Sequence, residues 1–261
     1  MIRHRKKTLN KPERMFSMNL FVSFICVIGF TLIHYFSKYM SFADKAPRSK
    51  FLSFSGGVAV SYVFVDLLPK LNEYQLILLV RLENSIWRNI ENHIYIIALL
   101  GLVLFYSLER LAKRTKNDLH LTEKTKANVS IFWIHMSAFF VYNAIIGYLL
   151  VKEPFENSYG ILFYFLALSV HFITNDWSLR RDHVKVYDQY GRYLLIVAPI
   201  IGWLIGLLTE VNEFVLSILQ AFIIGGIVLN ALKEELPEEK ESSLVSFLLG
   251  AIGYTLLLLL I

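Results

Sequence analysis

Two side chains on one face of an apolar helix are the best candidates in this chain for binding a cation. His171 and Asn175 stand four residues apart inside an apolar run, so a helix places them one turn apart on the same face. Asn143, in an earlier apolar run, offers a further amide oxygen. Zinc prefers His, Cys and carboxylate ligands, and oxygen-rich sites favour harder ions. The pattern predicts either a weak metal site or a hydrogen-bond cluster between helices.

Asp66 and Glu234 are carboxylates at the ends of two similar apolar segments. Each stands three residues before a proline, and each segment begins with paired glycines, in GGVAVSYVFVDLLPK from Gly56 and GGIVLNALKEELPEE from Gly225. A proline after a helical acid ends or kinks the helix, and paired glycines let neighbouring helices approach closely. The echo predicts two related halves, each with an acid at the end of a tightly packed helix. Chance similarity between apolar helices is the alternative.

Asp176 is a further acid near the first candidate site. It follows His171 by five residues and has Arg180 one turn further along. A salt bridge from Asp176 to Arg180 is therefore the favoured interpretation, and metal ligation by Asp176 is the alternative. His34 and His93 lie near the ends of apolar runs, so we expect both at the membrane interface.

The segment Leu179–Arg192 (LRRDHVKVYDQYGR) carries an unusual concentration of charge. We interpret it as a loop that fixes the topology and contacts anionic lipid. Two sharper alternatives are a phosphate site and a gate that closes by pairing its own charges.

The elements that must position these side chains are apolar helices of membrane-spanning length. Of the 261 residues, 56% are hydrophobic and 18% are charged, against about 25% charged in a typical soluble domain. A hydrocarbon core roughly 30 Å thick needs about 20 helical residues. The runs do not alternate at period two, which argues against barrel strands. Eight spans are predicted: 16–36, 51–69, 93–111, 129–151, 158–177, 193–209, 214–232 and 243–261.

These spans predict an all-α, polytopic protein with a basic N-terminal tail (1–15) and a single transmembrane domain (16–261). The stretch 74–92 has charges at intervals and is expected to lie at the interface rather than to form a ninth span. The basic residues gather in short connections, so the expected partner is the lipid bilayer of the cell membrane and not nucleic acid. A homodimer is left open.

The connections also predict an orientation. Those after spans one, three and five are richer in Lys and Arg than those after spans two, four and six, which places the former in the cytoplasm and both termini outside. The basic residues of the N-terminal tail argue for the opposite orientation.

Eight spans, outside termini and the acid-x-Leu-Pro ending shared by spans two and seven resemble the ZIP (zinc/iron permease) family of metal transporters. The segment from Ala221 to Ile261 carries the clearest local match. The resemblance implies an eight-helix bundle with inverted-repeat character. It also implies a divalent metal, zinc, iron or manganese, as the transported substrate. On span two, Asp66 stands where the family has a His.

The metal-site motifs of the family are only partly present. Span four keeps Asn143 of His-Asn-x-x-Asp-Gly but has Tyr142 for the His and Ile146 for the acid. Span five keeps His171 of His-Glu-x-Pro-(His/Glu)-Glu and has Asn175 where a His or Glu would stand. The family's two-metal centre cannot be built from these residues, so a site with fewer metal ligands is expected.

Three functions remain as hypotheses. The first is a divalent-cation carrier in which Asn143, His171 and Asn175 line the site, Asp66 or Asp176 adds a ligand, and Asp66 and Glu234 lie on the pathway. The second is a membrane protein that kept the fold, lost transport and serves a binding or structural role. The third is an intramembrane enzyme acting on a lipid headgroup, with His171 beside the basic segment. Walker A, Gly-x-Ser-x-Gly, His-Glu-x-x-His and haem-attachment motifs are absent, so ATP-driven transport by this chain alone is not expected. Of the three functions the carrier is preferred, and neither an enzyme nor a covalently bound cofactor is predicted.

Overall fold

The computed structural model is helical throughout the residues that it describes, which are 11–39, 48–82, 92–117, 124–155, 157–182, 184–235 and 243–260. No strand occurs within these ranges. The α-helices are α1 (Lys11–Phe36), α2 (Arg48–Tyr62), α3 (Leu68–Arg81), α4 (His93–Asn117), α5 (Lys124–Lys152), α6 (Ser158–Asp182), α7 (Val184–Val186), α8 (Arg192–Leu208), α9 (Glu213–Asn230) and α10 (Leu244–Leu258). The remaining helical segments are the 3₁₀ turn η1 (Ser37–Tyr39) and the π-helices η3 (Val63–Leu67), η5 (Tyr187–Gly191) and η6 (Ala231–Glu235).

Seven helices in the described part of the chain are long and apolar enough to cross a membrane. They confirm the prediction of an all-α, multi-pass membrane protein. The predicted eighth span, 243–261, contains α10, whose 15 residues extend only about 22 Å at 1.5 Å per residue. That is shorter than a hydrocarbon core roughly 30 Å thick, so the count of eight spans is not established.

The second span is longer than predicted, because Pro69 does not end it. Apolar helix continues from Lys50 to Arg81. Before the proline, the Leu68 N–H bonds to the Val63 carbonyl five residues back, which is a π-helical bond. Pro69 then lies in the first turn of α3, where its missing N–H costs little. Of the stretch 74–92 that was expected at the interface, residues 74–81 are helical and continue the helix of the second span, and 83–91 lie outside the described residues.

The two segments that looked alike in the sequence also share a local structure. Asp66 is the fourth residue of the π-helix η3, and Glu234 is the fourth residue of the π-helix η6. Inserted π-helical turns are rare and occur often at functional sites. The Glu234 side chain lies outside the described part of the structure, whereas the surroundings of Asp66 are described below.

Three helix pairs pack through reciprocal glycines, which explains why so many glycines lie in apolar helices. In each pair, a Cβ on either glycine would lie 1.7–2.1 Å from a backbone oxygen of the partner helix, so a larger residue would force the helices apart. The pairs are α2 with α10 (Gly57 and Gly250), α4 with α9 (Gly101 and Gly225), and α5 with α8 (Gly147 and Gly202).

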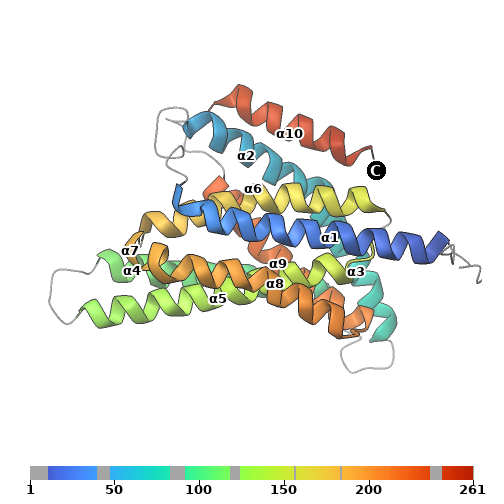
Figure 1. Cartoon of the computed structure of the whole chain (residues 1–261), viewed down its shortest axis with the longest axis horizontal. Helices are drawn as coiled ribbons and strands as arrows, with labels where there is room; N and C mark the ends of the chain where they lie inside the picture. The colour runs from blue at the N-terminus through green and yellow to red at the C-terminus, as the bar shows by residue number, and fades with distance from the viewer. Residues whose placement is uncertain are drawn as a thin grey trace, which may run out of the picture.

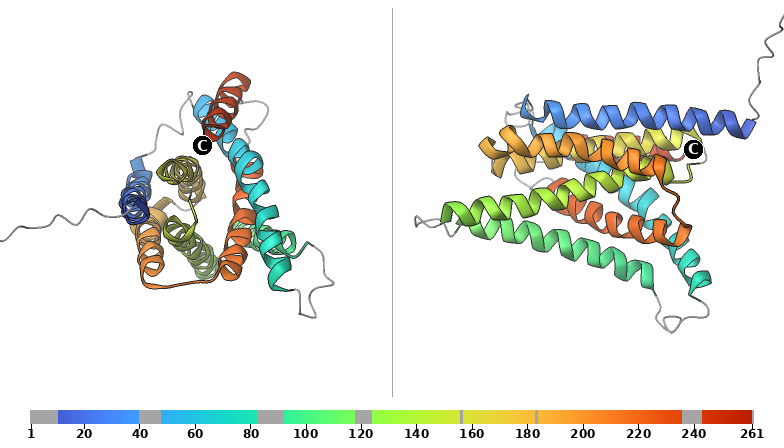
Figure 2. Two further views of the ribbon diagram at one scale, coloured as in Figure 1. Left: turned by 90° about the vertical axis from the view of Figure 1, so that its right-hand side faces the viewer. Right: turned by 60° about the horizontal axis from the view of Figure 1, so that its bottom comes forward.

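The helices form two groups that meet in the middle of the molecule. α1 packs on α6 and α8, and α5 packs on α8, whereas α3, α4 and α9 pack together and α2 packs on α10. Seen end-on in Figure 2, α1 and α8 lie on one side, α3 and α9 lie on the other, and α5 and α6 stand between them. The polar side chains of Asn143 on α5 and of His171, Asn175 and Asp176 on α6 are buried in the interior.

Candidate functional site

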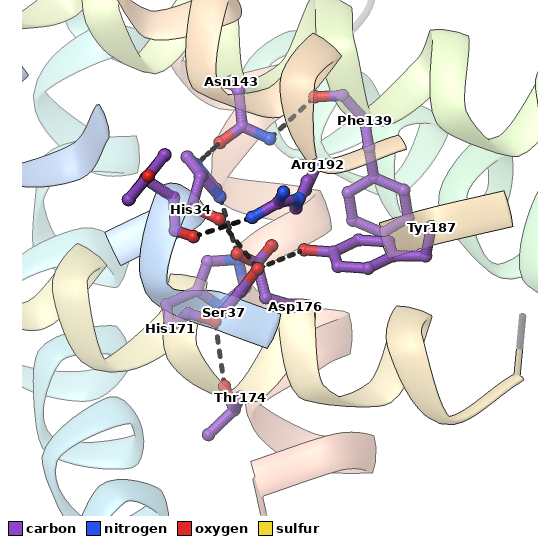
Figure 3. Close-up of polar contacts among 10 residues, drawn as sticks. His34, Ser37, Phe139, Asn143, His171, Thr174, Asp176, Tyr187 and Arg192 are labelled. Carbon is purple, nitrogen blue, oxygen red and sulfur yellow. Dashed lines mark hydrogen bonds and ion pairs between the residues drawn. The ribbon is translucent and has the colours of Figure 1, made fainter. Parts of the chain in front are cut away.

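A buried polar centre is built around His34, near the end of α1 (Figure 3). The His34 Nδ1 lies 2.8 Å from Oδ2 of Asp176 on α6, and its Nε2 lies 3.1 Å from Oδ1 of Asn143 on α5. The exposed fractions of His34, Asp176 and Asn143 are 1%, 0% and 0%. Three helices thus contribute an imidazole, a carboxylate and an amide to one enclosed site.

The hydrogen bonds of Asn143 indicate where the protons lie. Its Nδ2 donates to the Phe139 carbonyl at 2.7 Å, so its Oδ1 faces His34 as an acceptor and the His34 Nε2 must donate. A second proton is then needed between His34 Nδ1 and Asp176 Oδ2, because neither bare atom can donate. The pair shares this proton, either as imidazolium–carboxylate or as imidazole–carboxylic acid.

Asp176 does not pair with Arg180 as the sequence suggested. Arg180 instead forms a two-pronged ion pair with Asp188 of η5, with Nε–Oδ1 and Nη2–Oδ2 distances of 2.8 and 2.9 Å. Asp176 points toward α1, where it meets His34, and its Oδ1 has no hydrogen-bond partner within the described part of the chain. A fully buried carboxylate oxygen in this state is able to accept a further ligand.

His171 belongs to a neighbouring contact and not to the one around His34. Its Nε2 lies 3.0 Å from the Tyr142 hydroxyl, and its carbonyl accepts a bond from Thr174 Oγ1 at 2.9 Å. Tyr142 and Asn143 are consecutive on α5, so this helix joins the two contacts. Asn175 is buried on α6, one turn from His171.

The residues predicted to be metal ligands therefore bond to different protein groups and do not converge on one point. Asn143 bonds to His34, and His171 bonds to Tyr142. Among the described residues, no three His, Cys, Asp or Glu side chains lie close enough together to hold a metal ion as they stand. His34 was missed because the end of an apolar run favours an interfacial position, whereas the structure buries its side chain against α5 and α6. The feature of the sequence that could have identified His34 is its ionisable side chain within an apolar span, because such residues are usually functional.

A second polar cluster contains Asp66 and lies at the other end of the bundle, where α3 meets the connection between α5 and α6 (Figure 1). The Lys70 Nζ lies 3.1 Å from Asp66 Oδ2 and 3.4 Å from Glu153 Oε1. The Tyr74 hydroxyl donates to Glu153 Oε1 at 3.3 Å. Burial raises the pKa of the Glu153 carboxyl, against the opposing effect of the Lys70 ammonium.

The segment Leu179–Arg192 is not the loop that the sequence suggested. α6 continues to Asp182 and η5 leads directly into α8, and the side chains of Arg181 and His183 lie outside the described residues. Arg192 is buried, and it donates to the carbonyls of Asp188 (2.9 Å) and Tyr35 (3.2 Å). Arg180 and Arg192 thus tie the start of α8 to α6 and to the end of α1.

Comparison with protein-family models, with curated proteins and with solved structures returns no match. The resemblance to the ZIP family therefore rests on the motifs in the sequence alone. The functional argument has to be made from the geometry of the two polar clusters.

Proposed function

We propose that this protein is a membrane carrier for a divalent cation, and that the centre formed by His34, Asp176 and Asn143 is its central binding site. The observation that carries the proposal is the His34–Asp176 pair, 2.8 Å apart and almost wholly buried between membrane-length helices. Ionisable groups are costly inside a membrane, and where they occur they commonly mark ion and proton pathways. The cell membrane is part of this proposal.

The ligand chemistry of the centre suits a transition-metal ion. Imidazole and carboxylate are preferred ligands of zinc, and both also bind iron and manganese. The unpartnered Asp176 Oδ1 offers a position for the ion. His34 has to release a proton to bind it, so cation and proton compete for the same pair.

Binding requires a rearrangement of the contacts seen here. Both ring nitrogens of His34 are bonded to protein groups, and the His171 Nε2 is bonded to Tyr142. A cation would replace Asn143 or Asp176 as a partner of His34, and His171 would become available if Tyr142 withdrew. Relative movement of the two helix groups, as in carriers that rock between two states, would supply this change.

The same closed geometry favours one alternative, a membrane protein of this architecture that no longer transports. In that case the His34 centre would serve only to lock α1, α5 and α6 together. The two functions differ in whether a cation ever reaches Asp176.

Uptake into proteoliposomes would test the proposal, with zinc, manganese and iron(II) offered separately. His34→Ala and Asp176→Asn should each lower uptake of the transported ion about tenfold or more, as losses of metal-site groups commonly do. Glu213→Gln, an exposed carboxylate in the first turn of α9, and His135→Gln, outside the centre, are the matched controls. Absence of uptake of all three ions by the wild type would favour the structural alternative. Uptake that is unaffected by His34→Ala would instead show that the His34 centre is not the binding site.

A further inference from the structure

A small cavity of about 20 Å³ lies beside the second polar cluster, between α3, α9 and the end of α5. Such a volume holds about one water molecule or one small ion. Its lining includes aliphatic side chains of α9 together with six polar residues: Tyr62, Lys70, Tyr74, Glu153, Tyr164 and Gln220.

Two of these polar side chains have no hydrogen-bond partner in the described part of the chain. The Gln220 amide uses neither its oxygen nor its nitrogen, and the Tyr62 hydroxyl is unpaired, although each residue is only 3% exposed. A buried polar group that is left without a partner destabilises the folded protein. Polar groups that line a cavity of this size normally bind a ligand or a water molecule in it.

The charges around the cavity do not balance. Asp66 and Glu153 are two carboxylates, and Lys70 is the only cation within 4.0 Å that the structure describes for either of them. The side chain of Glu153 is 10% exposed. A surplus negative charge with so little access to water favours the binding of a cation.

The Lys70 side chain is able to move out of the cluster. Its side chain is 25% exposed, and it reaches Asp66 from one helical turn further along the chain. The ammonium group sits on a flexible four-carbon stem and makes no fixed fork of bonds, unlike a guanidinium. Swinging outward would expose it to solvent and vacate the space between the two carboxylates.

We propose that Asp66, Glu153, Tyr62 and Gln220 form a second cation site, and that the Lys70 ammonium occupies the place that a divalent cation takes when it binds. All the protein ligands here are oxygen atoms, a set typical of hard ions such as Mn²⁺, Mg²⁺ or Ca²⁺. Exchange of Lys70 for such an ion would neutralise both carboxylates. The inference rests on the proposed function for the idea that a divalent ion reaches this end of the bundle.

A larger cavity offers access to this site. Glu153 also lines a space of about 170 Å³ together with Asn19 and Ser23 of α1. That volume holds several water molecules, since each takes up about 30 Å³ in the liquid. Glu153 thus stands between a hydrated space and the smaller cavity, where an arriving cation would meet its carboxylate first.

The first experiment measures Mn²⁺ binding to the purified protein by electron paramagnetic resonance. Lys70→Met should bind one Mn²⁺ about tenfold more tightly than the wild type if the lysine fills the site for about nine-tenths of the time. Lys70→Arg should show no gain. The double variant Lys70→Met/Glu153→Gln should lose the gain, and Lys185→Met, an exposed lysine on α7, is the control. Equal Mn²⁺ affinity in Lys70→Met and wild type would overturn the proposal.

A second measurement uses the wild type and does not depend on the folding of a variant. Amine acetylation followed by mass spectrometry should label Lys70 several-fold faster in saturating Mn²⁺, because the ion drives the ammonium outward. The labelling of Lys185 should not change. Unchanged or slower labelling of Lys70 would contradict the exchange.

Measuring Mn²⁺ binding directly distinguishes failure of this inference from failure of the proposed function. If the wild type takes up none of the three ions but Lys70→Met still gains an Mn²⁺ ion, then the second site stands and the carrier proposal fails. If uptake depends on His34 and Lys70→Met gains nothing, then only the second site fails.

Discussion

The two polar centres differ in their burial and in how their side chains are paired. His34 uses both ring nitrogens in bonds to Asp176 and Asn143, and all three residues are shut away from solvent. At the other end, Asp66 and Glu153 share the single ammonium of Lys70, beside a cavity with unpaired polar atoms. The groups of the first centre can therefore change partners only when its helices move, whereas the second centre has the space and the charge to accept a cation with a movement of Lys70 alone.

The largest expected effect is at the closed centre. His34→Ala leaves the Asp176 carboxyl fully buried without its imidazole, and breaking a buried pair in this way costs about 3–5 kcal/mol of folding free energy. Asp176→Asn should cost much less, because the amide oxygen can still accept a bond from His34. Thermal unfolding in detergent would measure both. Equal losses for the two variants would show that the pairing itself contributes little.

The second largest effect is expected from overpacking between α10 and α2, the helix that leads into η3 and Asp66. Gly250→Ala on α10 would place a Cβ 2.1 Å from the Phe54 carbonyl of α2 and should cost about 1–3 kcal/mol, the usual penalty of overpacking. Gly253→Ala on the same helix meets no atom within 4 Å and should change stability by less than about 0.5 kcal/mol. Unfolding of the two variants side by side makes the comparison. A larger loss for Gly253→Ala would mean that α10 packs differently.

Lys70→Met should have a smaller effect at the open centre. Its partners are partly exposed and can bind a proton or another cation, so the loss should lie near 1 kcal/mol, at the upper end for accessible ion pairs. Added Mn²⁺ should restore this stability in Lys70→Met at about a tenth of the concentration that stabilises His34→Ala, in which Lys70 still competes for the site. Thermal unfolding over a series of Mn²⁺ concentrations tests the contrast. The same Mn²⁺ dependence in both variants would mean that Mn²⁺ acts elsewhere.

The smallest effect is a pH dependence from Glu153, whose neighbours in the cluster are Lys70, Tyr74 and Asp66. Because the pKa of Glu153 is higher in the folded protein than its ordinary value of 4.5, its contribution to stability is complete below that value and is lost as pH rises through the folded pKa. Glu153→Gln should remove this component of the pH profile. Unfolding of both proteins from acid to neutral pH measures it, and identical profiles would contradict the raised pKa.

Local sequence properties were enough to predict the helices and much of their length. Apolar runs of about 20 residues have few alternatives to membrane helices, because the bilayer satisfies no backbone hydrogen bonds. Predictions from local patterns failed in two segments of the chain. Pro69 was expected to end or kink the second helix, and the helix continues past it through a π-helical turn. The segment Leu179–Arg192 was expected to be a loop, but Arg180 and Arg192 are bonded within helical structure.

The sequence by itself therefore determined the class of this protein and the recurrence of an acid before a proline at Asp66 and Glu234. Hydropathy and turn chemistry act over a few residues, so they can be deduced from short segments. Only the tertiary structure decided that His34 meets Asp176, 142 positions away, and that Lys70 meets Glu153. Those partners depend on how each helix is rotated and on how closely glycines let it approach its neighbours, and these are properties of the whole bundle.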